Sequence, residues 1–289
     1  MEDVAPRARF SPAVFCFLFA FSIYIPSARF IILTTIHTLA SGSSGNAALV
    51  SCCGVHVLLD AGISCRRIVV ALRTLGVEPE ELAAVFITHT HTDHIGGLQT
   101  FVKKCAVPVY ASRRTCAGLA YRIAGIEPLL RPFADGETIS LDGLTVTSFP
   151  TCHDAPGACG YRFGDAGVLT DSGYVTEEAA AVLTGVPLLV LEANHDVDAL
   201  RSGPYPYYLK QRILGPEGHL SNEDAAAFAL VSARAGTREI VLAHLSRENN
   251  TPAMALNAVG RVLETLDVPV PLSVAPRDTV SQGYHTKTD

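Results

Sequence analysis

Four side chains that can bind a divalent metal ion crowd into the segment FITHTHTDHIGGL, residues 86–98. They are His89, His91, Asp93 and His94, placed between an apolar run and two glycines. In an extended segment the first three project to one side, and His94 turns inward where the strand breaks. Imidazoles and carboxylates suit zinc, manganese or iron, and the absence of cysteine from the cluster argues against a closed structural zinc site. The alternative, a solvated polar turn, leaves this concentration of ligands unexplained.

Other metal-binding side chains stand where predicted strands stop. The hairpin ETISLDGLTVTSFPTCH turns at Asp142-Gly143 and delivers His153 to a strand end. A second hairpin, GYRFGDAGVLTDSG, delivers Asp171, and the strand EIVLA precedes His244. The same edge of the sheets therefore collects ligands. One metal ion can be held by His89, His91 and His153, a second by Asp93, His94 and His244, and Asp171 can bridge the two.

From residue 30 onward, short β-branched runs alternate with turn signals and helical stretches, which is typical of a layered α/β protein. Outside the two hairpins, strands are expected within residues 47–52, 55–62, 83–91, 107–112, 187–196 and 239–244. Helices are expected within residues 65–76, 94–105 and 221–234. Neither a repeat nor a low-complexity linker interrupts this pattern. We predict one domain, residues 31–289, after an N-terminal extension, residues 1–30.

The extension contains an apolar run, residues 11–25, behind Arg7 and Arg9. This run resembles the core of a signal peptide and is short for a membrane span. A membrane anchor, an export signal and an extension unrelated to the fold are the three interpretations. We favour the last, because the sequence after residue 30 continues directly into the first expected strand. No stable membrane partner is expected.

Composition and charge are ordinary for a globular protein of 289 residues, with 48% hydrophobic residues. The net charge of −6 argues against a protein that coats nucleic acid non-specifically, but it does not exclude a phosphate substrate. The eight cysteines form no CxxC motif and no regular framework. Reduced thiols in a cytoplasmic protein are therefore expected.

Together, these segments resemble the metallo-β-lactamase superfamily, whose ordered motif set is HxHxDH, a lone histidine, an aspartate in TDSG and a late histidine. Within it, SGSSGN, THTHTDH, CHDA, EANHD, GPYPYYLKQRI, GHLSN and AHLSRENN resemble the YycJ/WalJ group of hydrolases. The resemblance covers about residues 36–289. It implies a four-layer αββα sandwich, a binuclear site where strand ends meet, and nuclease activity.

Departures within the superfamily narrow the expected activity. Lactam-hydrolysing members commonly use a cysteine ligand where this chain offers Asp171, and flavodiiron-type proteins place a glutamate where His91 stands. The inserted domain of the RNA-processing β-CASP members needs more than the about seventy residues between Asp171 and His244. A compact hydrolase with two divalent ions, Zn²⁺ or Mn²⁺, remains. Such a pair acidifies a bridging water to hydroxide and stabilises the oxygens of an in-line displacement.

Resemblance to tRNA-processing members adds a proton donor, because their paired Glu and His align with Glu192 and His219. In that role Glu192 orients His219, which protonates the leaving oxygen. Both are therefore counted as catalytic, together with Asp93. The alternative is that His219 merely caps the helix that starts near Ser221. His195 is either a partner of the site or a structural histidine.

Two segments are expected to bind substrate. The turn SGSSGN offers Ser43, Ser44 and Asn46 beside backbone N–H groups that can approach an anionic oxygen, although a tight turn alone explains it equally well. The loop RSGPYPYYLKQR interleaves basic and aromatic side chains suited to phosphate contact and base stacking. Its substrate-binding candidates are Tyr207, Lys210 and Arg212. An ordinary loop packed by its tyrosines is the alternative.

The leading prediction is a metal-dependent hydrolase of nucleic-acid phosphodiesters, a DNA exonuclease as the resemblance implies. The motifs alone support only a binuclear metallohydrolase. The alternative enzyme is a thioester or small-ester hydrolase of glyoxalase II type, which uses the same ligands. A non-catalytic interaction protein of cell-wall signalling is the alternative from another class.

Overall fold

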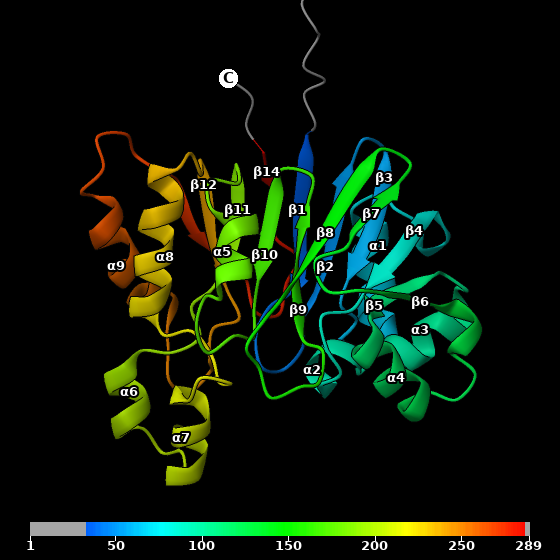
Figure 1. The fold of residues 1–289 in the computed structure, drawn as a ribbon, viewed down its shortest axis with the longest axis horizontal. Coiled ribbons are helices and arrows are strands. Elements are labelled where there is room, and N and C mark those ends of the chain that lie inside the picture. The colour runs from blue at the N-terminus through cyan, green and yellow to red at the C-terminus, as the bar shows by residue number, and fades with distance from the viewer. Residues whose placement is uncertain (1–32, 287–289) are drawn as a thin grey trace, which may run out of the picture. The chain divides into compact units, whose positions relative to one another are not determined.

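Two sheets, each of seven strands, lie face to face in the computed structural model, which describes residues 33–286. The described residues belong to one compact unit. Helices cover the outer face of each sheet (Figure 1). The predicted αββα sandwich is confirmed. The expected extension, residues 1–30, lies outside the described residues.

The first sheet is mixed. Its strand order is β14 (Tyr284–His285), β1 (Thr34–Ala40), β2 (Ala47–Cys52), β3 (Val55–Leu59), β4 (Leu82–Phe86), β5 (Val109–Ser112), β6 (Leu130–Phe133). The outer face of this sheet packs against α1 (Cys65–Thr74), α3 (Leu98–Lys104) and α4 (Arg113–Arg122). Short 3₁₀ turns, Pro79–Glu81 and Glu127–Leu129, precede β4 and β6.

The second sheet has the order β13 (Leu272–Val274), β12 (Glu239–Ala243), β11 (Leu188–Glu192), β10 (Ala166–Leu169), β9 (Cys159–Phe163), β8 (Leu144–Pro150), β7 (Thr138–Leu141). Its outer face packs against α5 (Glu177–Leu183), α8 (Asn222–Arg234) and α9 (Pro252–Leu263). Three further helices, α2 (Thr92–Ile95), α6 (Val197–Ser202) and α7 (Tyr207–Leu214), stand at the strand ends at the lower edge in Figure 1.

Central strands are apolar on both faces because each face meets a different core. In β4, Ala84 and Phe86 point between the sheets, whereas Val85 packs towards the helices of the first sheet. In β11, Val190 points between the sheets and Leu191 packs under α8 and α9. Period-two alternation thus supplies both cores from one continuous apolar run.

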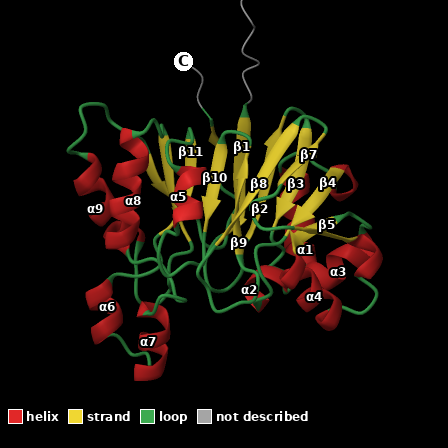
Figure 2. Cartoon of the chain, viewed as in Figure 1, coloured by secondary structure: helices red, strands yellow, loops and turns green. Residues whose placement is uncertain are grey.

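Several strands end at one edge. β10, β11 and β12 are parallel, and β8 runs in the same direction because β9 is antiparallel to both β8 and β10. In the first sheet β3, β4 and β5 are parallel. Figure 2 shows the loops that join these ends to α2, α6 and α7 in green. Residues that directly follow these strands are therefore brought together.

Local signals located most elements correctly. The hairpin turn at Asp142-Gly143 is confirmed: Leu141 pairs with Leu144, and both turn residues have positive φ. Ser221 caps α8, as one of two expected candidates. The expected loop RSGPYPYYLKQR is wrong in part, because its first two residues end α6 and Tyr207–Leu214 forms α7, with Pro206 as the N-cap. Within the described residues no helix is long and apolar enough to cross a membrane.

Candidate metal centre

All seven expected ligands follow strand ends at the shared edge. His89 and His91 lie on the loop after β4, His153 on the loop after β8 and Asp171 on the loop after β10. His244 comes directly after β12. The remaining two, Asp93 and His94, lie in α2. One edge of the sandwich therefore brings together side chains that are far apart in the sequence; His89 and His244 are separated by 155 positions.

The expectation that Asp93 continues an extended segment is wrong. β4 ends at Phe86, and His91 is the N-cap of α2, so Asp93 lies in the first helical turn. Tertiary contacts hold this short helix, because the Asp93 carbonyl accepts from Asn46 N at 2.7 Å. The neighbouring loop comes so close that a Cβ at Gly62 would lie 1.6 Å from the Asp93 carbonyl oxygen.

Three residues of this edge adopt left-handed backbone conformations, which are uncommon for residues other than glycine. They are Asp60, Asp171 and His244, with φ values of 58°, 59° and 56°. Each follows a strand within two residues. Such a conformation reverses the chain sharply at the strand end, and strained residues of this kind cluster at functional sites.

Six of the seven side chains form two groups of three. The ligand atoms of His89, His91 and His153 all lie within 4.8 Å of one another. The same holds for Asp93, His94 and His244.

Asp171 lies between these groups. Its Oδ2 is 3.2 Å from His94 Nε2, and its Oδ1 is 3.8 Å from His153 Nε2. The carboxylate can therefore contribute to either group, and it also forms a group of its own with His89 and His94.

Unpartnered polar atoms at the centre fit metal ligands. His89 Nε2, His244 Nε2 and Asp171 Oδ2 are buried and form no hydrogen bond. Burying such atoms without a partner costs free energy, so native proteins rarely contain them together. Imidazole nitrogens and carboxylate oxygens suit Zn²⁺ and Mn²⁺. The residues present therefore fit divalent ions.

Hydrogen bonds on the outer side of the rings fix their orientation. His94 Nδ1 donates to Asp60 Oδ2 at 2.7 Å, and His244 Nδ1 donates to Glu192 Oε1 at 2.8 Å. His153 Nδ1 donates to the Gly218 carbonyl at 3.1 Å. In His153 and His244 this bond leaves the Nε2 lone pair facing the centre, as metal ligation requires, whereas His94 Nε2 also accepts from the Asn46 amide.

Charge dominates burial in setting the pKa values of the central groups. Burial raises the pKa of Asp171, but His244 and His94 bring that pKa well below its usual range. Burial also raises the pKa of Asp93, but the neighbouring His244 and His94 lower that pKa well below its usual range. Burial lowers the pKa of His244, but Asp171, Asp93 and Glu192 raise it overall to about 10. The carboxylates are therefore charged at neutral pH and attract cations.

Glu192 connects the ligand His244 to His219. Its Oε1 accepts from the Nδ1 atoms of both rings at 2.8 Å, and its Oε2 accepts from Leu220 N at 3.2 Å. Burial raises the pKa of Glu192, but His219 and His244 lower it to about 2. The His219 side chain is 19% exposed, so it can reach a substrate at the mouth of the centre.

No side-chain hydrogen bond supports a purely structural role for His219 or His195. The cap of α8 is Ser221, whose Oγ accepts from Asp224 N at 3.0 Å, and not His219. His195 is buried, and neither of its ring nitrogens forms a hydrogen bond. Burial lowers the pKa of His195 to about 4.

The expected substrate residues occupy two places. Ser43 and Ser44 are exposed on the β1–β2 loop, whereas Asn46 is buried and its amide nitrogen donates to His94 Nε2 at 3.0 Å. On α7, Tyr207 is 77% exposed, and Lys210 Nζ donates to the Arg201 carbonyl. The remaining candidate, Arg212, donates from Nε to Asp154 Oδ2.

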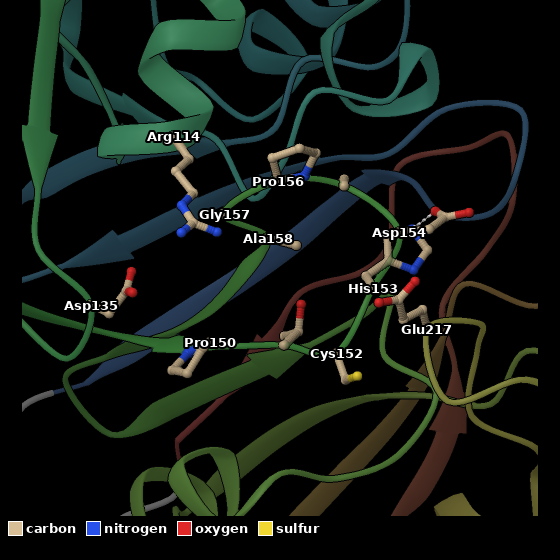
Figure 3. A pocket seen from close by; sticks show the side chains of 12 residues that line it. Arg114, Asp135, Pro150, Cys152, His153, Asp154, Pro156, Gly157, Ala158 and Glu217 are labelled. Carbon is tan, nitrogen blue, oxygen red and sulfur yellow. Dashed lines mark ion pairs between the residues drawn. The ribbon is translucent and has the colours of Figure 1, made fainter.

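A cleft of about 580 Å³ opens beside the first ligand group. Figure 3 shows His153, Asp154 and Glu217 at one end of this cleft and Arg114 at the other. A second cleft of about 350 Å³ shares Asp154 and Glu217 and extends to Arg212 of α7. Asp154 therefore stands at the junction of both clefts with the metal centre.

Sequence analysis missed two residues of this site, Asp60 and Asp154. Asp60 follows the buried strand β3 directly, the same signal that identified the other ligands, and it was detectable on that basis. Asp154 follows His153 and carries no separate signal, because its importance depends on contacts with His91 and α7.

The β-lactamase superfamily domain model matches residues 56–245, and this span contains all seven expected ligands. The chain belongs to the β-lactamase superfamily. It is 36% identical over 248 residues to exodeoxyribonuclease WalJ of Streptococcus pneumoniae serotype 2 (strain D39 / NCTC 7466), covering 83% of this chain and 92% of that protein. It is also 36% identical to exodeoxyribonuclease YycJ of Bacillus anthracis, covering 78% and 88%.

A solved structure shows the same fold. The metallo-β-lactamase fold protein YhfI from Bacillus subtilis aligns with a TM-score of 0.66 at 18% identity, covering 88% of this chain and 99% of that one. Superfamily membership and the cluster of histidines and aspartates together establish a metal-dependent hydrolase.

Removal of a ligand from the second group should reduce the metal content. We expect Asp93→Ala and His244→Ala each to hold fewer ions per chain and to lose turnover, because each variant lacks one of the donor atoms that bind the second ion. His56→Ala, a histidine of β3 outside the ligand groups, is the matched control. Elemental analysis and circular dichroism measure metal and fold. Full metal content with full activity in either ligand variant would refute the assignment.

Proposed function

We propose that this chain is a binuclear metal-dependent phosphodiesterase that degrades DNA as an exonuclease. The observation that carries the proposal is the pair of three-residue ligand groups joined by Asp171. The names of the relatives, exodeoxyribonucleases at 36% identity over most of both chains, support nucleic acid as the substrate. We place this activity in the cytoplasm, because the cysteines lack a disulfide framework.

The proposed cofactors are two divalent ions, Zn²⁺ or Mn²⁺. The first is assigned to His89, His91 and His153, the second to Asp93, His94 and His244, and Asp171 is shared. When bound, such a pair lowers the pKa of water to give a hydroxide nucleophile and neutralises charge on a phosphodiester. Asp60 and Glu192 hold His94 and His244 in the orientation that this binding needs.

Proton delivery is assigned to His219. The leaving oxygen of a phosphodiester gains negative charge as its bond to phosphorus breaks, and a proton donor nearby lowers the barrier. The Nδ1 of His219 donates to buried Glu192, so its Nε2 is the atom available to the leaving oxygen. Glu192 accepts from His219 Nδ1 at 2.8 Å and so holds the ring in place for this transfer.

Substrate contacts are assigned to both sides of the centre. Ser43 and Ser44 are free to reach a phosphate oxygen, and Asn46 orients the second ligand group through His94. On α7, the exposed Tyr207 offers a face for base stacking, beside Tyr208, which is 74% exposed.

Two cations of α7 complete this assignment. Lys210 and Arg212 supply positive charge that attracts the phosphate backbone. The chain as a whole has a net charge of −6 and would otherwise repel it.

Assays with labelled DNA should detect this activity. The metal-loaded protein should shorten duplex or single-stranded DNA from an end, and Asp93→Ala should not. RNA of the same sequence and a generic thioester should be assayed in parallel as alternative substrates. Hydrolysis of the thioester without any cleavage of nucleic acid would overturn the phosphodiesterase proposal, and equal cleavage of RNA would overturn the restriction to DNA.

His219→Ala separates acid catalysis from a structural role. Removal of a general acid typically lowers kcat about a hundred- to ten-thousand-fold, and we expect a loss in this range at unchanged metal content. The loss should shrink with a nitrophenyl phosphodiester, because nitrophenolate departs without protonation. Ser221→Ala is the control, since loss of the α8 cap costs about 1 kcal/mol of stability and spares the chemistry. Equal losses on both substrates would instead indicate positioning.

A further inference from the structure

One of the histidine ligands differs from the others in its outer contacts. His94, His244 and His153 each donate from Nδ1 to a carboxylate or carbonyl oxygen, and His89 Nδ1 donates to Thr88 Oγ1 at 3.0 Å. In His91 the ring is reversed. Its Nδ1 faces the centre, 3.2 Å from His153 Nε2, so its Nε2 points outward and needs the acceptor.

The nearest acceptor of this kind is Asp154. Its Oδ1 lies 3.5 Å from His91 Nε2 and equally 3.5 Å from His153 Nε2. This oxygen is buried and forms no hydrogen bond, although its side chain as a whole is 26% exposed. An unpartnered carboxylate oxygen beside an outward-facing imidazole nitrogen is one small adjustment away from a charge-assisted hydrogen bond.

The second oxygen of Asp154 ties it to α7. Oδ2 accepts from Arg212 Nε, and Arg212 belongs to the helix that carries the exposed tyrosines. A second carboxylate, Glu217, lines both clefts, and within residues 33–286 no hydrogen bond or ion pair joins it to the ligand groups. Asp154 is thus the one side chain here that contacts both the first ligand group and α7.

We propose that Asp154 is a positioning residue of the first metal site: it accepts from His91 Nε2, holds Nδ1 towards the ion, and links the ion to α7 through Arg212. This inference rests on the metal centre proposed above. The role matches that of Asp60 towards His94 and of Glu192 towards His244. It also means that a phosphate bound by Arg212 competes with Asp154 for the guanidinium and so changes the support of His91.

Metal affinity tests this role without reference to activity. Titration of the metal-free protein with Zn²⁺ against a chromogenic chelator yields a dissociation constant for each ion. Loss of an outer partner of a metal ligand typically weakens metal binding about 10- to 100-fold. Asp154→Asn should therefore weaken the binding of one ion by this factor and leave the binding of the other unchanged. His91→Ala should weaken the binding of the same ion. Glu217→Gln is the matched control and should change neither.

The competing outcomes are distinct. Unchanged binding of both ions by Asp154→Asn overturns the positioning role and leaves the metal centre intact, whereas fewer than two Zn²⁺ in the unaltered protein overturns the centre itself. An oxygen of Asp154 about 2.0–2.2 Å from Zn²⁺ in a crystal structure would make Asp154 a ligand and overturn positioning. Arg212→Gln, which keeps Asp154 in place, should weaken the same ion to a smaller extent. If Asp154→Asn does not fold, unchanged binding by Arg212→Gln overturns the proposal.

Discussion

Burial of the Asp171 carboxylate sets the main physical constraint on this protein. An isolated charge in a protein interior is so costly that it must be paired or neutralised. Asp171 is 2% exposed, its pKa lies well below the usual range, and the histidines of both ligand groups surround it. The divalent ions proposed here would satisfy this carboxylate and the unpartnered nitrogens around it at once. Removing one partner from such a buried network typically costs about 3–5 kcal/mol.

The strand topology of the sandwich brings the residues around Asp171 together. Parallel strands of the second sheet and of the first end at one edge, so residues far apart in sequence become neighbours. Left-handed backbone at Asp60, Asp171 and His244 turns the chain immediately after each strand. Three apolar cores, one between the sheets and one beneath the helices of each sheet, hold the strands in register. Rigid strand ends suit a centre whose ligands must be placed closely.

Sequence patterns located most strands and the residues of the proposed metal centre because both depend on local signals, whereas the four-layer sandwich was expected from the family resemblance. Apolar runs with polar ends identified the strands, and Asp142-Gly143 identified a hairpin without any knowledge of the partner strand. The helical position of Asp93 escaped prediction because α2 has only four residues, and contacts with Asn46 and Gly62 stabilise it from outside. The contact between Asp154 and Arg212 spans 58 positions and leaves no local trace.

Glu192 shows how the centre and the proposed proton donor depend on each other. One buried oxygen accepts from His244, a ligand, and from His219, so the orientation of the acid depends on the same carboxylate that supports the second ion. Asp154 occupies the comparable place towards the first ligand group. The proposed centre thus consists of two ligand groups with separate outer supports and one shared carboxylate.

Anomalous diffraction from crystals of the zinc-loaded protein tests this central claim most directly. Two peaks should appear about 3.5–4 Å apart, the spacing of two-metal hydrolytic sites. One should lie among His89, His91 and His153, the other among Asp93, His94 and His244, with Asp171 between them. A single peak, or two peaks that leave Asp171 uncoordinated, would contradict the account.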